Sequence, residues 1–86
     1  MWYHVWMSRD EKIILKMKQS PRNVCFSELD GFLRRAGFER RQPRKGSSHY
    51  FYFRADGVRF TLVKPHGNRK AVDPAAIAIV LEALDL

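Results

Sequence analysis

The sequence predicts an α+β fold in which a three-stranded antiparallel sheet packs one face against two helices, with one extra helix in front. Three observations support this fold class. Helix-capping residues precede apolar residues at helical spacing on both sides of the chain's centre, and strand-like stretches rich in aromatic residues lie between them. The last two of these stretches are joined by an Asp-Gly pair, which is typical of a hairpin turn. With 86 residues, the chain has room for one domain and one core.

The first helix is expected over residues 9–19. Ser8 and Glu11 match a capping box, in which each side chain bonds the other residue's backbone N–H. Ser20-Pro21 closes the helix, because the residue before a proline is disfavoured in the helical conformation. The apolar residues of this helix recur at near-helical spacing: Ile13, Ile14 and Met17.

The second helix ends at Gly37, a residue type suited to the left-handed conformation at helix C-termini. Ser27 is its expected N-cap, and Glu28 and Asp30 place negative charge in its first turn. One face of the helix carries an apolar stripe made of Leu29, Phe32, Leu33 and Ala36.

Three strands are expected next, over residues 38–42, 47–54 and 58–63, with a polar turn from Pro43 to Gly46. The alternation in the third strand directs an apolar set toward the core: Val58, Phe60 and Leu62. If Phe51 and Phe53 join that set, His49 lies on the core side of its strand, at the end beside the basic turn. The residues then expected on the open face or its edge are Tyr50, Tyr52, Arg54 and Arg59.

The last helix has Asp73 as its expected N-cap and Pro74 at its first position, where the missing N–H costs nothing. Apolar residues lie on more than one side, and this indicates that a partner or the N-terminal helix lies across it. The packing stripe is Ile77, Val80, Leu81 and Leu84, and the residues mostly off it are Ala75, Ile79 and Leu86.

The positive charge of the chain is concentrated in its middle. Sixteen Lys and Arg against nine Asp and Glu give a net charge of +7. Residues 39–72 alone hold nine basic and two acidic residues, also net +7, so the rest of the chain sums to zero. Such a concentration attracts a polyanion, and nucleic acid is the commonest one in a cytosol; a solvated basic face is the alternative.

Several function classes find no support in the sequence. No apolar run approaches the ~20 residues of a membrane-spanning helix, and the start of the chain does not resemble a signal peptide. Cys25 is the single cysteine, so no internal disulfide can form, and a reducing, cytoplasmic location is expected. The sequence contains no metal-ligand spacing and no cofactor-binding glycine loop, so neither a metal nor a cofactor is expected.

His49 is the residue most suited to catalysis. Histidine is the side chain whose ordinary titration lies near neutral pH, and RNA cleavage needs no metal if a base takes the 2′-OH proton and an acid protonates the leaving oxygen. Arg44 and Lys45 would stabilise the charge that develops on phosphorus. A purely structural histidine is the alternative. His66 lies in a basic loop and is either a second acid/base group, a phosphate contact or only a loop residue.

Five segments resemble, in the same order, the HicA toxins of bacterial toxin–antitoxin systems. The resemblance spans residues 26–85 and rests on Gly37-Phe38, Lys45-Gly46-Ser47-Ser48-His49-Tyr50, Asp56-Gly57, Lys64-Pro65-His66 and the final helix ending Val80-Leu81-Glu82-Ala83-Leu84. Two features depart from it. Many relatives have two adjacent histidines where Tyr50 follows His49 here, and many lack the extension from Trp2 to Gln19.

The resemblance implies a double-stranded-RNA-binding-like fold for residues 25–86, preceded by an extension, residues 1–24, with a short helix. It further implies an endoribonuclease that cleaves mRNA and is neutralised by a HicB-type antitoxin encoded alongside, in a homodimer or a toxin–antitoxin hetero-oligomer. His49 matches the family's catalytic histidine. A non-catalytic RNA-binding module of the same fold is the alternative. The residues expected to contact RNA are Arg44, Lys45, Gly46, Ser47, Ser48, Tyr50, Arg59, Lys64 and His66.

Overall fold

A computed structural model describes residues 8–42 and 44–86 and confirms the α+β class, with one extra helix at the N-terminus. Residues 1–7 and Pro43, part of the expected polar turn, lie outside the described residues. The elements in chain order are α1 (Arg9–Gln19), the 3-10 turn η1 (Pro21–Asn23), α2 (Phe26–Arg35), β1 (Glu39–Arg41), β2 (His49–Phe53), β3 (Arg59–Val63) and α3 (Pro74–Ala83).

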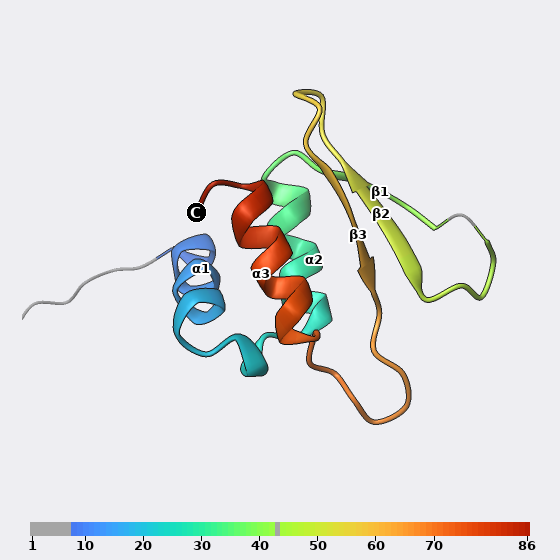
Figure 1. Ribbon diagram of the computed structural model, residues 1–86, viewed down its shortest axis with the longest axis horizontal. Helices are drawn as coiled ribbons and strands as arrows, with labels where there is room; N and C mark the ends of the chain where they lie inside the picture. The colour runs from blue at the N-terminus through green and yellow to red at the C-terminus, as the bar shows by residue number, and fades with distance from the viewer. Residues whose placement is uncertain (1–7, 43) are drawn as a thin grey trace, which may run out of the picture.

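The elements form three layers (Figure 1). The sheet has the order β1-β2-β3 with both neighbouring pairs antiparallel. Helices α2 and α3 lie side by side against one face of the sheet, and α1 packs on the other side of these two helices. The core therefore lies between the sheet and the helices, and the second face of the sheet is open within the described part of the chain.

Helix α1 begins with the expected capping box and is part of the same core as the rest of the chain. The Ser8 hydroxyl accepts from the Glu11 N–H at 3.1 Å, and the Glu11 carboxylate accepts from the Ser8 N–H at 3.0 Å. Ile13 and Met17 are buried in the main apolar cluster. Residues 8–24, the described part of the N-terminal extension, are thus packed onto the domain through the apolar face of α1.

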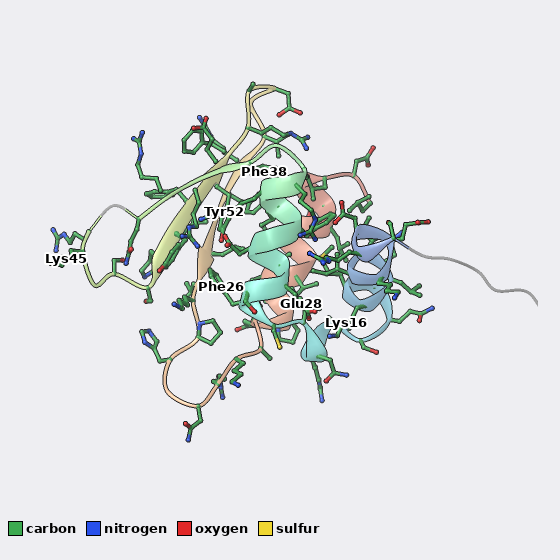
Figure 2. The ribbon with its side chains drawn as sticks, turned by 180° about the vertical axis from the view of Figure 1, so that it is seen from behind. Lys16, Phe26, Glu28, Phe38, Lys45 and Tyr52 are labelled. Carbon is green, nitrogen blue, oxygen red and sulfur yellow. The ribbon has the colours of Figure 1, made fainter. Side chains whose placement is uncertain are left out.

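Two ion pairs orient α1 on α2. Lys16 Nζ lies 2.9 Å from a Glu28 carboxylate oxygen (Figure 2). Arg35 Nε lies 2.7 Å from the Asp10 carboxylate. Burial of Glu28 opposes its ionisation, but hydrogen bonds from Lys16 and from the Cys25 N–H outweigh it and keep the pKa of Glu28 below its ordinary value. Because both pairs are partly exposed, they fix the helix orientation more than they stabilise the fold.

The N-cap of α2 is Cys25 rather than the expected Ser27, which lies inside the first turn. The reason is a backbone bridge that the local pattern does not show: Cys25 pairs with Ala71, and the Phe26 N–H donates to the Lys70 carbonyl at 3.0 Å. This pairing holds Cys25 extended, so the helix begins at the next residue, Phe26. Asp30 consequently lies beyond the first turn.

Gly37 follows the C-cap of α2 and ends this helix as expected, with a φ of 95°. The Phe38 N–H donates to the Leu33 carbonyl at 2.9 Å, which closes the turn after the helix. Next to it, Arg54 donates to the Ala36 carbonyl at 3.2 Å and its guanidinium lies 4.7 Å from the centre of the Phe38 ring. The end of the β2–β3 hairpin is therefore locked to the end of α2.

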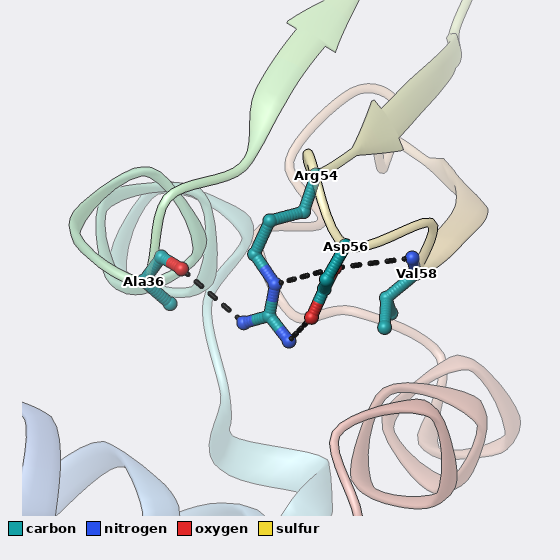
Figure 3. A network of polar contacts seen from close by, with 4 residues as sticks. All are labelled: Ala36, Arg54, Asp56 and Val58. Atoms are coloured by element: carbon teal, nitrogen blue, oxygen red, sulfur yellow. Dashed lines mark hydrogen bonds and ion pairs between the residues drawn. The ribbon is translucent and has the colours of Figure 1, made fainter.

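Arg54 also stabilises the turn between β2 and β3 (Figure 3). Arg54 forms an ion pair with Asp56 at 2.7 Å, and the Asp56 carboxylate also accepts from the Val58 N–H at 3.2 Å. The bonds from Arg54 and from the Val58 N–H hold the pKa of Asp56 below its ordinary value. Arg54 thus reaches the helix layer, whereas the sequence predicts it on the open face or its edge.

The expected orientation of β2 is wrong. Tyr52 is fully buried and Tyr50 is half-buried on the core face, opposite Phe60 and Leu62 of β3. His49 is consequently not on the core side but on the open face, together with Phe51 and Phe53, which were expected inside. Alternation could not decide between the two faces, because both sets are aromatic.

The Asp30 carboxylate explains the orientation that the strand adopts. It accepts a hydrogen bond from the Tyr52 hydroxyl at 2.7 Å and forms ion pairs with Arg40 at 3.2 Å and with Arg34 at 3.3 Å. Burial, reinforced by the bond to Asp30, raises the pKa of Tyr52 well above its ordinary value. A tyrosine can occupy this core position because its polar tip has a partner on α2; a phenylalanine there would leave one acceptor site of Asp30 without its donor.

Helix α3 begins as expected, with the Asp73 carboxylate accepting from the Ala75 N–H at 2.8 Å and Pro74 at the first position. Ile77 and Val80 are buried against the sheet and the other helices. Helix α1 contacts α3, as the second apolar side of that helix predicted. Ile79 remains 51% exposed, so α1 covers only part of the apolar surface.

We expect Tyr52→Phe to lower the free energy of unfolding by about 1.5–2 kcal/mol, because a hydrogen bond to the Asp30 carboxylate is lost while the ring still packs. Urea unfolding at pH 7 measures the change. Tyr50→Phe is the matched control, since Tyr50 contributes its ring to contacts with Phe26 and Arg40, and its unfolding curve should stay close to that of the parent. Equal, small effects of the two changes would contradict the role given to Asp30.

Candidate nucleic-acid interface

His49 is the first residue of β2 and its side chain is exposed on the open face of the sheet. Its backbone N–H donates to the Ser47 hydroxyl at 3.1 Å, and its neighbour across the sheet is Val63, which is 48% exposed. The strand fixes the backbone while the imidazole is accessible to solvent. A ligand that lies along the end of the sheet can therefore reach the ring.

The turn that precedes His49 carries the first group of cations. Arg44 and Lys45 are exposed, and Figure 2 shows Lys45 at the tip of the turn, away from the helices. The Ser47 N–H donates to the Arg44 carbonyl at 3.0 Å, and Gly46 has a φ of 84°, which an L-residue adopts only at a cost. The turn thus projects both cations at the same end of the sheet as His49.

The loop from Lys64 to Lys70 carries the second group of cations and is anchored at both ends. The Lys64 N–H donates to the Ser48 carbonyl at 2.8 Å, and the Lys70 carbonyl accepts from the N–H of Phe26 at the start of α2. These bonds place the loop beside the start of β2. His66 is exposed within the loop, next to a turn at Gly67.

A hollow of 420 Å³ lies between this loop and the start of α2. One carboxylate, Asp30, faces it, and that group is already paired with Arg34 and Arg40. The cationic side chains that line the hollow are Arg40, Lys64, Arg69 and Lys70. The balance of charge in the hollow therefore favours an anion.

A second hollow, of 490 Å³, lies on the open face of the sheet. Phe51 is 44% exposed there, and the Arg41 guanidinium lies 5.7 Å from the centre of the Phe53 ring. Arg59 and Thr61 of β3 complete the lining on this face. Exposed aromatic rings with arginine side chains beside them are suited to binding planar, negatively charged ligands.

Most cations of the central segment are available to a ligand. Of the nine basic residues in residues 39–72, Arg40 and Arg54 take part in salt bridges. The other seven have no acidic partner within residues 8–42 and 44–86: Arg41, Arg44, Lys45, Arg59, Lys64, Arg69 and Lys70. The concentration of charge seen in the sequence is thus a surface property and not a set of internal ion pairs.

The structure brings most of the expected site residues to one end of the sheet and separates two from it. That end of the sheet is shared by His49, the turn residues Arg44 to Ser48, and the loop residues Lys64 and His66. Arg59 lies opposite Phe53, two rows further along the open face. Tyr50 faces the core, where its ring meets Phe26 at 5.4 Å between centroids and Arg40 at 4.9 Å, so its ring is not beside His49.

Sequence reasoning missed several residues of this surface. The alternation along β2 favours a core position for Phe51 and Phe53, and the sequence identifies Arg41 only as part of the positive charge, yet all three line the hollow on the open face. Arg69 and Lys70 were likewise only part of a basic loop. Their positions depend on the face of β2 and on the bridge between Cys25 and Ala71, and neither contact leaves a local pattern.

Searches against protein-family models, curated proteins and solved structures return no match to this chain. Across the described residues, no helix has both the length and the apolar character needed to span a membrane. The same residues contain no group of three or more His, Cys, Asp or Glu side chains placed to hold a metal ion.

We expect His49→Ala to leave the stability of the protein nearly unchanged, within about 0.5 kcal/mol, because the side chain is exposed and surface substitutions have small effects. Thermal unfolding followed by circular dichroism measures this. A large loss of stability would show that the imidazole packs in the protein and is not held out for a ligand.

Proposed function

We propose that this chain is an endoribonuclease that cleaves mRNA without a metal ion and acts as the toxin of a toxin–antitoxin pair. The observation that carries the proposal is the position of His49, whose exposed imidazole lies at the end of the sheet between two basic segments. The sequence resemblance to HicA toxins supports the same function, since His49 matches the catalytic histidine of that family.

The proposed reaction is an internal transfer on the RNA backbone. The imidazole of His49 removes the proton from a ribose 2′-hydroxyl, and the 2′-oxygen attacks the adjacent phosphorus. The bond to the 5′-oxygen of the next nucleotide breaks, and that oxygen takes up a proton. The products are a 2′,3′-cyclic phosphate and a free 5′-hydroxyl. The step therefore consumes no water and needs no metal.

The basic segments beside His49 have a separate role in this proposal. The phosphorus passes through a state with extra negative charge on its oxygens, and fixed cations stabilise that charge more than they stabilise the starting phosphate. Arg44 and Lys45 on one side and Lys64 on the other are placed to do this. Their exposure also lets them attract RNA from solution.

A HicB-type antitoxin encoded alongside is the proposed protein partner. If the chain is such a toxin, its expression alone should arrest growth, and co-expression of the neighbouring gene should restore it. A partner that neutralises the toxin has to block RNA from His49, directly or through the basic loops.

A non-catalytic module that binds duplex RNA is the second candidate, and one contact weighs against it. Duplex-binding domains of this element order use cations at the start of the last helix to bind phosphates. Here the exposed Asp73 carboxylate caps that helix by accepting from the Ala75 N–H. A phosphate approaching the start of α3 would therefore meet a negative charge.

We expect the purified chain to cleave single-stranded RNA in the presence of EDTA and to leave 2′,3′-cyclic phosphate and 5′-hydroxyl ends. His49→Ala should slow cleavage at least about 100-fold, because proton transfer by a positioned side chain contributes factors of this size. Gel analysis of end-labelled oligonucleotides measures both. A strict requirement for a divalent ion, or an equally active His49→Ala variant, would contradict the proposal.

We expect His66→Ala to slow cleavage as well, if the loop histidine supplies the proton to the leaving oxygen. The rate under single-turnover conditions, compared with that of Asn68→Ala in the same loop, isolates this role from general disturbance of the loop. Equal rates for the two variants would remove His66 from the reaction and leave both proton transfers to His49.

A further inference from the structure

The open face of the sheet carries a row of exposed residues that leads to His49. Register pairs on this face are Arg41 with Phe51, Phe51 with Thr61, and His49 with Val63. Successive pairs on one face lie about 7 Å apart along a strand. Phe51 therefore lies one row from His49, with an arginine on one side and a small threonine on the other.

Phe51 is positioned to contact a ligand that lies on the open face of the sheet. Phe51 is 44% exposed and lines the 490 Å³ hollow together with Arg41 and Arg59. A ligand that covers this exposed apolar area would gain free energy by removing it from water. Nucleic-acid bases are planar and stack on such rings, while their phosphates pair with cations nearby.

The charges on this face favour a negatively charged ligand. Arg41 and Arg59 are without an acidic partner within the described residues, and a carboxylate on the same face, Glu39, lies at the end far from His49. Arg59 lies in the same row as Glu39, across Phe53, and Arg41 lies opposite Phe51, so the two guanidinium groups outweigh that carboxylate and favour a polyanion. An apolar protein surface would leave these two guanidinium groups without partners.

The shape of the site distinguishes single strands from duplexes. Bases in a duplex are stacked on each other and paired, so their faces cannot reach an aromatic ring on a sheet. Only unpaired bases can lie on Phe51. The acidic cap of α3 at Asp73 likewise discourages the duplex mode in which phosphates lie at the start of that helix.

We propose that the open face binds single-stranded RNA by stacking a base on Phe51, with Arg41 and Arg59 contacting the backbone beside it. This inference rests on the proposed function, because it places that base one row from His49 and so next to the phosphate that is cleaved. Phe51 is then a positioning residue: it sets which phosphate lies against the imidazole.

The test measures binding separately from cleavage. In the full chain carrying His49→Ala, fluorescence anisotropy follows binding of a labelled 12-nucleotide RNA, both as a single strand and annealed to its complement. Phe51→Ala should weaken binding of the single strand about tenfold. Phe51→Leu should weaken it similarly, because it keeps the apolar surface but loses the π face, whereas Phe51→Trp should keep or tighten binding.

Leu15→Ala is the matched control, since Leu15 is 40% exposed but lies on α1, across the helix layer from the sheet. Single-strand binding unchanged by Phe51→Ala, or changed equally by Leu15→Ala, overturns the inference; so does a duplex that binds as tightly as the single strand. Thermal unfolding of each variant confirms that it is folded.

Cleavage is assayed in the protein that retains His49, and this assay tests the proposed function alone. If His49 is needed for cleavage but Phe51→Ala changes neither single-strand binding nor the position of the cut, the stacking site fails and the nuclease stands. If the parent does not cleave RNA while Phe51→Ala weakens single-strand binding, the nuclease fails and the site remains as a binding surface.

Discussion

The hydrogen bond between Tyr52 and Asp30 decides what the other face of the sheet presents to solvent. It joins the middle strand to α2 at 2.7 Å and leaves the Tyr52 side chain fully buried. Because side chains alternate along a strand, turning Tyr52 inward turns His49 and Phe51 outward. The exposed histidine is therefore a consequence of core packing. The ion pairs of Asp30 with Arg34 and Arg40 hold the carboxylate in place for this bond.

The loops at the end of the sheet are positioned by backbone contacts instead. The bond from the Lys64 N–H to the Ser48 carbonyl and the bridge between Cys25 and Ala71 anchor the segment that carries His66. The backbone of this loop is thus held at both ends, while its cationic side chains project outward. Such an arrangement lowers the entropy that a ligand must remove on binding, since the backbone is already ordered.

Much of the fold can be predicted from local pattern, because each element contains its own boundary residues. The capping box at Ser8, the left-handed Gly37 and the cap at Asp73 all appear where the sequence places them. The orientation of β2 cannot be predicted this way, because its two faces are almost equally aromatic and the deciding partner, Asp30, is distant in sequence. The start of α2 at Cys25 depends on Ala71 for the same reason.

The same distinction explains which parts of the candidate site were foreseen. A histidine beside a run of cations is visible in the sequence, so His49, Arg44 and Lys45 could be selected from residue type alone. Phe51 could not, because an aromatic residue in a strand is ordinarily part of the core. Only the packing of Tyr52 shows that Phe51 must be exposed, in one hollow with Arg41 and Arg59, which have no acidic partner among the described residues. Burial on one face of β2 stabilises the fold, while the proposed recognition of RNA uses the other face, which can therefore be substituted without disturbing the core.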